Sequence, residues 1–210
     1  MPLSTPIARS KTAALARILD SIPKGYTLYT CGEVKAEKAR ALILKLHQRH
    51  AICATPAQRV TRKQKGLANV LLVMYEPPGA TTVHWLMLFT PGTLQSHENL
   101  QSVTDRKRLV WQDYELVRLS GAGQTRWSWR RTKEEMAEAY CELDRYLYKG
   151  QHEAVLALLE RQAKQPGFHG VREQSWALQQ HARSRGYQGK LPHLFFVQKV
   201  SHGERFTFTL

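Results

Sequence analysis

The stretch VLLVMYEPPGATTVHWLMLF, residues 70–89, decides the fold of this chain. Two apolar runs flank a Pro-Pro-Gly sequence, and these residues favour a tight turn. Short runs of Val, Leu, Met and Phe bounded by turn residues are typical of buried β-strands. The stretch therefore predicts a β-hairpin whose second strand opens with Thr82-Val83-His84.

The sequence on either side of this hairpin predicts alternating strands and helices. Helical spacing of apolar residues predicts helices at 12–22, 35–50, 94–108, 132–148, 152–165 and 172–185. Strands are expected at 26–31, 108–119 and 125–132, with a closing hairpin formed by 193–200 and 205–210. This order predicts an α+β fold with an antiparallel ferredoxin-like or RRM-like sheet, helices on one face and a helical C-terminal extension.

The charge balance narrows the partners that the protein can have. The chain has 210 residues, with 31 Lys and Arg against 17 Asp and Glu, which gives a net charge of +14. Such an excess favours nucleic acid first and an anionic membrane surface second. No run is apolar enough to span a membrane, no secretory signal is present, and Cys31, Cys53 and Cys141 have no paired spacing. We therefore expect a cytoplasmic protein without a membrane partner.

Two domains are expected from the same pattern. Residues 1–150 are predicted to form the α+β nucleic-acid-binding core. Residues 151–210 are predicted to form a helical extension with the closing hairpin, packed on that core. Other proteins of a nucleoprotein complex are further possible partners.

A polar, basic segment at residues 54–66 is predicted to be a loop. It contains Arg59, Arg62, Lys63 and Lys65, which are the first candidates for contact with the phosphates of single-stranded DNA or RNA. The alternative is that this loop is merely solvated.

A second set of basic candidates lies in the segment TRWSWRR, residues 125–131. On a strand, Trp127 and Trp129 share one face, whereas Arg126 and Arg130 share the other. The expected arrangement buries the Trp pair and offers Arg126, Arg130 and the adjacent Arg131 to nucleic acid. The alternative leaves the Trp face open for base stacking.

Three residues are candidates for catalysis. His84 begins the second strand of the hairpin, and a capped helix 62 residues later ends in Tyr146-Leu147-Tyr148-Lys149-Gly150. Tyr146 and Lys149 are three residues apart, so they share a helix face. A tyrosine can attack a phosphodiester, and a lysine beside it can steady the phosphate.

The order of these elements resembles the HUH endonuclease superfamily of rolling-circle replication initiators and relaxases, over about residues 26–150. The resemblance implies that Tyr146 is the nucleophile and that Lys149 and His84 are also catalytic. It implies a divalent metal, Mg²⁺ or Mn²⁺, held by His84. Glu76 is a further candidate as a carboxylate ligand if its side chain points toward His84. The family carries His-hydrophobe-His, but here Thr82 stands at the first His. The site is therefore expected to be degenerate in part.

Several functions stay open at this point. The first is a DNA-binding, HUH-like protein of a mobile element or its replication and transfer machinery, with or without nicking activity. The second is an RRM-like RNA-binding or RNA-processing subunit of a ribonucleoprotein complex, as in CRISPR systems. The third is a non-catalytic basic subunit of a nucleoprotein assembly. The structural alternatives assign no function to these residues. His84 would then be a half-buried strand histidine that is hydrogen-bonded to a backbone carbonyl, and Tyr146 and Tyr148 would be core and rim aromatics of an amphipathic helix.

Overall fold

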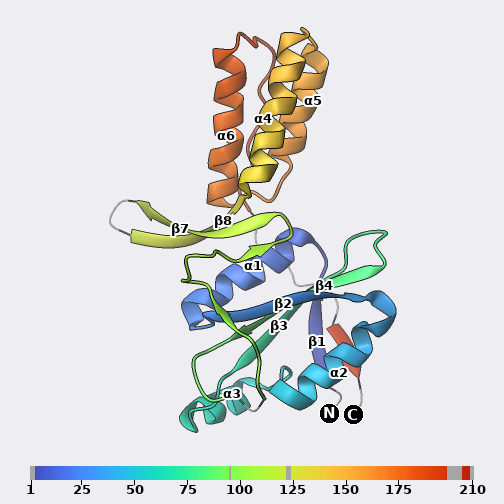
Figure 1. Cartoon of the computed structure of the whole chain (residues 1–210), viewed down its shortest axis with the longest axis vertical. Helices are drawn as coiled ribbons and strands as arrows, with labels where there is room; N and C mark the ends of the chain where they lie inside the picture. The colour runs from blue at the N-terminus through green and yellow to red at the C-terminus, as the bar shows by residue number, and fades with distance from the viewer. Residues whose placement is uncertain (1–2, 95, 122–123, 198–204, 209–210) are drawn as a thin grey trace. The chain divides into compact units, whose positions relative to one another are not determined.

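The computed structural model describes residues 3–94, 96–121, 124–197 and 205–208. The chain forms two compact units, Met1–Arg106 with Val200–Leu210, and Lys107–Lys199 (Figure 1). The β-hairpin at residues 114–131 groups with the helices that follow it rather than with the first sheet. The units therefore differ from the division at residue 150 expected from the sequence.

The first unit is built on a sheet in the order β5-β2-β4-β3-β1-β9. Its strands are β1 (Leu3–Ala8), β2 (Leu28–Lys35), β3 (Val70–Tyr75), β4 (Thr82–Phe89), β5 (Gln101–Ser102) and β9 (Arg205–Phe208). The expected hairpin is confirmed as β3 and β4, and β4 also pairs along its whole length with β2. The α+β class is confirmed, but the sheet is mixed rather than antiparallel, because β1 runs parallel to β3.

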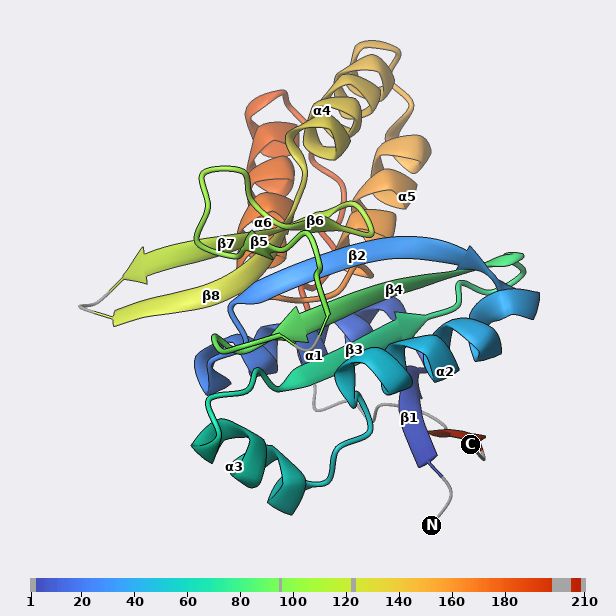
Figure 2. The same cartoon turned by 60° about the horizontal axis from the view of Figure 1, so that its bottom comes forward.

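Helices cover both faces of this sheet. The helices of this unit are α1 (Lys11–Ser21), α2 (Ala39–His50) and α3 (Pro56–Gln64), with short 3₁₀ turns at Ile22–Lys24 and Ala36–Lys38. The two faces are covered by α1 and α2. Helix α1 lies on the face opposite to α2 (Figure 2). The expectation of helices on one face is therefore wrong. The reason is physical: β3 is buried at every position, so both of its faces need an apolar cover.

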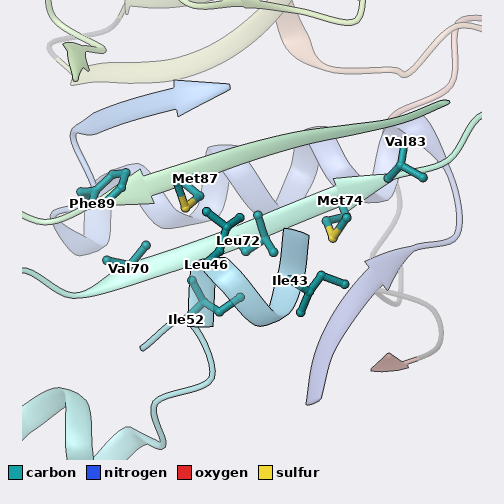
Figure 3. Packing of buried hydrophobic residues seen from close by; sticks show 9 residues of the cluster. All are labelled: Ile43, Leu46, Ile52, Val70, Leu72, Met74, Val83, Met87 and Phe89. Carbon is teal, nitrogen blue, oxygen red and sulfur yellow. The ribbon is translucent and has the colours of Figure 1, made fainter. Parts of the chain in front are cut away.

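The core between the sheet and α2 uses alternate strand residues (Figure 3). Side chains of β3 and β4 that point to one face meet the apolar stripe of α2 and the turn after it. The buried cluster contains Ile43, Leu46, Ile52, Val70, Leu72, Met74, Val83, Met87 and Phe89. This packing fixes α2, so its remaining faces are turned away from the core.

Local signals predicted some segments correctly and others not. The helix expected at 12–22 is confirmed as α1, which Ser10 caps, since the Ala13 amide donates to Ser10 Oγ at 3.1 Å. The expected helix at 94–108 is absent from the described residues there, which contain β5 and turns. In the expected closing hairpin, residues 193–197 form no strand and residues 198–204 lie outside the described part. Strand β9 pairs with β1 instead.

The second unit joins a small sheet to three helices. Strands β6 (Val110–Trp111), β7 (Tyr114–Gly121) and β8 (Gln124–Arg131) form an antiparallel sheet, which confirms the expected hairpin. The helices are α4 (Lys133–Tyr148), α5 (His152–Ala163) and α6 (His169–Ser184). Thr132 caps α4 as expected, because its hydroxyl accepts from the Glu135 amide. Among the described residues, none of the helices combines the length and apolar composition that a membrane span requires.

One glycine in the first unit supports a tight approach of two loops. Gly92 has a φ of +147°, and a Cβ added there meets the Ala68 amide nitrogen at 2.7 Å. The neighbouring Thr93 exchanges backbone hydrogen bonds with this segment, from Thr93 N to Gly66 O at 2.9 Å and from Ala68 N to Thr93 O at 3.0 Å. A side chain at residue 92 therefore pushes apart the loop that follows β4 and the segment that precedes β3.

We expect Gly92→Ala to lower the free energy of unfolding by about 3 kcal/mol, since it adds a backbone clash to an unfavourable φ. The matched control is Gly79→Ala, whose φ is +74° with no atom within 4 Å of the added Cβ. That control should cost only about 1 kcal/mol. Urea unfolding of both variants measures the difference, and equal losses would contradict the close approach.

Candidate nucleic-acid interface

The excess positive charge of the first unit is concentrated in one segment. Residues 35–65 contain nine Lys and Arg and a single acid, Glu37. The rest of that unit contains six Lys and Arg and six acids, so it is neutral by formal charge. The segment spans the 3₁₀ turn at Ala36–Lys38, helix α2 and helix α3. We call it the α2–α3 basic segment.

Helix α2 presents its basic residues to solvent because its apolar stripe is used by the sheet. Ile43 and Leu46 point into the core, whereas Lys45 and Arg49 are exposed and lie one turn apart. Lys38 and Arg40 are exposed as well. These four residues are not among the nucleic-acid-binding candidates predicted from the sequence. Their helical spacing opposite that stripe was the available signal.

Helix α3 stands where a loop was expected. Its start is a capping box: the Gln58 amide donates to Thr55 Oγ1 at 3.3 Å, and the Thr55 amide donates to Gln58 Oε1 at 2.8 Å. Pro56 follows at the first helical position, where its fixed φ favours a helix. No residue of α3 is buried, so this short helix depends on its cap and on anchoring contacts.

Those anchoring contacts involve two of the predicted binding residues. Arg62 Nη2 donates to Ala68 O at 2.9 Å, and Asn69 Nδ2 donates to Arg59 O at 3.0 Å. Arg59 and Arg62 are accordingly half-buried, whereas Lys63 and Lys65 are exposed. The structure thus brings the four predicted cations onto one helix and its C-cap. The two lysines are the ones most accessible to a phosphate.

A groove of about 510 Å³ lies between the end of α2 and α3. Its apolar lining consists of Ala51, Cys53, Ala54, Ala57 and Leu67, and its polar lining consists of His47, Gln58, Thr61, Arg62 and Lys65. Burial lowers the pKa of His47, which keeps its imidazole uncharged at neutral pH. The cations of the groove are therefore Arg62 and Lys65.

His84 has a different environment from the one that the resemblance implies. It lies on β4, and its Nδ1 is 3.1 Å from Glu33 Oε1 on the neighbouring strand β2. Glu76 is exposed beyond the end of β3, and Thr82 offers only a hydroxyl. In the described parts of the chain, no group of three or more His, Cys, Asp and Glu side chains is arranged to hold a metal ion. The donors around His84 do not make a two-histidine metal site.

Tyr146 and Lys149 lie at the end of α4, in the second unit, whereas His84 belongs to the first. The Tyr146 hydroxyl donates to Glu142 Oε1 at 3.0 Å. Burial raises the pKa of Glu142, but hydrogen bonds from Tyr146 and Arg161 outweigh it and the pKa is lowered. Tyr146 also borders a shallow hollow of about 670 Å³ with Gly150, Gln151, His152, Glu153 and Ala154. Lys149 is exposed at the C-cap.

The three arginines predicted on the second hairpin have different roles. Arg126 is exposed, and Arg130 is half-buried and donates to Glu115 through Nε. Arg131 is only 3 % exposed. Its guanidinium donates to Ser175 Oγ at 2.8 Å, to Val171 O at 3.1 Å and to the side chain of Gln162. Arg131 therefore links β8 to α5 and α6 and is not a surface contact. The expected burial of the Trp pair is met by Trp129, which is fully buried, but Trp127 is only half-buried.

Comparisons with protein-family models, with curated proteins and with solved structures find no match to this chain. The argument for function therefore depends on the residues of the chain and their arrangement.

Proposed function

We propose that the protein binds nucleic acid through the α2–α3 basic segment. The observation that carries this proposal is the segregation of charge, with nine cations and one acid in residues 35–65 and a neutral remainder of the first unit. A surface of this kind attracts a polyanion and gains free energy by releasing the counterions that the phosphates hold.

A nucleic-acid backbone fits this segment better than an anionic membrane does. A helix that binds in the membrane interface exposes a continuous apolar face next to its cations. The apolar face of α2 is packed on the sheet instead, with Ile43 and Leu46 buried. On α3 the large exposed hydrophobic residue is Val60. Leu42 and Leu44 of α2 are half-buried and pack against the core cluster, and α3 contains no aromatic or leucine residue.

The proposal is tested by the salt dependence of binding. Fluorescence anisotropy of a labelled mixed-sequence single strand, as DNA and as RNA, is recorded between about 50 mM and about 200 mM salt. We expect the logarithm of the binding constant to fall linearly with the logarithm of salt concentration for at least one of them. Anionic lipid vesicles serve as a comparison. Binding to vesicles without binding to either nucleic acid contradicts the proposal.

A nicking activity at the end of α4 is the second candidate function. It is favoured by the hydrogen bond from the Tyr146 hydroxyl to Glu142 Oε1, which places a carboxylate acceptor beside the phenolic proton. In such a reaction the tyrosine oxygen attacks phosphorus and its proton passes to the carboxylate. The bond from phosphorus to the 3′ oxygen breaks, this oxygen leaves as a hydroxyl with a proton from water, and the 5′ phosphate stays attached to the tyrosine.

For that activity we expect Tyr146→Phe to remove both strand cleavage and the covalent protein–DNA adduct while leaving binding unchanged. Tyr148→Phe is the control, because Tyr148 is 93 % exposed two residues further along the chain. Denaturing gel electrophoresis of a labelled single strand, with Mg²⁺, Mn²⁺ or EDTA, measures both products. Cleavage that persists in Tyr146→Phe would exclude this tyrosine as the nucleophile.

A further inference from the structure

Part of the groove between α2 and α3 is lined by small apolar side chains. Ala51, Ala54 and Ala57 line it with methyl groups, and Leu67 lies at the point where the chain leaves α3 for β3. Small side chains leave room for a flat ring. An apolar lining also favours binding of the ring, because both surfaces are removed from water. A volume of about 510 Å³ is within the usual range for a small-molecule site.

The polar residues of the groove complement a nucleotide rather than a purely apolar ligand. Arg62 and Lys65 place two cations at the groove, where phosphates on either side of a bound base can meet them. Gln58 and Thr61 add uncharged hydrogen-bonding groups on the same helix. The groove also lies inside the segment that carries the positive charge of the unit.

We propose that this groove receives one unstacked base of a single-stranded nucleic acid, with the flanking phosphates held by Arg62 and Lys65. The inference rests on the proposed function and adds that the nucleic acid is bound as a single strand with one base unstacked. In a duplex the bases are stacked and paired, and extracting one costs free energy. The groove therefore makes the protein prefer single strands over duplexes of the same sequence.

Filling the groove without a change in charge tests this inference. Ala57→Phe places a ring where the base is to lie, and Ala41→Phe is the control on an exposed position of α2 that does not line the groove. We expect Ala57→Phe to weaken single-strand binding about tenfold, which is the usual effect of one stacked base. Duplex binding and the salt slope should stay the same. Ala41→Phe should match the parent protein.

An oligonucleotide with abasic sites provides a second readout. The parent protein should bind it about tenfold more weakly than the ordinary strand, and Ala57→Phe should bind the two strands equally. Thermal unfolding confirms that the variant is folded, and Ala54→Leu replaces it if it is not. A parent that binds abasic and ordinary strands equally overturns the groove inference alone. A parent that binds no nucleic acid overturns the proposed function instead.

Discussion

Replacing Lys45, Arg49, Lys63 and Lys65 together by Gln is expected to weaken single-strand binding at least tenfold, at about 50 mM salt. All four side chains are exposed on α2, on α3 or at its C-cap. Each cation that leaves a phosphate lowers the number of counterions released, by about 0.7 per contact on a single strand. The slope of affinity against salt should therefore become shallower by as much as about 3 for four lost contacts. Anisotropy titrations over a series of salt concentrations measure both quantities.

The control for this variant removes the same charge elsewhere. Lys24, Arg106, Lys133 and Lys164 are exposed and lie outside the α2–α3 basic segment. Their replacement by Gln should change affinity by much less than the first set does. Equal losses for the two sets would show that binding follows net charge and not this surface. Arg59 and Arg62 are left in place because their contacts with Asn69 and Ala68 help to hold α3.

Replacing Arg131 by Ala is expected to lower the free energy of unfolding by about 3 kcal/mol. Burial lowers the pKa of this guanidinium to about 10, so it is still charged at neutral pH and depends on its acceptors. The substitution leaves Val171 O and the side chains of Ser175 and Gln162 without this donor, and it opens a cavity between β8 and the helices. Urea unfolding followed by circular dichroism measures the loss.

The matched control is Arg126→Ala on the same strand. Arg126 is exposed, so its replacement should change the free energy of unfolding by no more than about 1 kcal/mol, the upper range for an exposed charged contact. In the same preparations, folded Arg131→Ala should bind nucleic acid as the parent does. A loss of affinity in Arg131→Ala without a loss of stability would contradict the structural role assigned to Arg131.

The sequence predicts the elements whose signals are local. The hairpin of β3 and β4 follows from two apolar runs around a turn, and α1 and α4 follow from caps at Ser10 and Thr132 and from helical spacing. Each of these signals depends on residues close together in the chain. Strand β1 carries Pro6 and is short, and it is paired with β3 and β9, which are distant in sequence. Pairing between strands that are distant in sequence has no signal in the residues next to each strand.

The candidate interface was predictable only in part. The sequence shows the basic cluster of Arg59, Arg62, Lys63 and Lys65. It also contains the capping box of Thr55 and Gln58, which starts a helix where a loop was predicted. The cations of α2 become candidates for binding only once the burial of Ile43 and Leu46 shows which side of the helix faces solvent. Arg131 is buried, whereas Arg126 on the same strand is exposed, and burial on a strand depends on the helices that pack against it.

The most direct test of the central claim is photo-crosslinking of the bound strand to the protein. A single strand containing 4-thiothymidine is irradiated in complex with the full chain, and the attached peptides are identified by mass spectrometry. We predict adducts within residues 35–67, which contain α2, α3 and the groove between them. Adducts confined to residues 107–199, or spread evenly over the chain, would contradict the account.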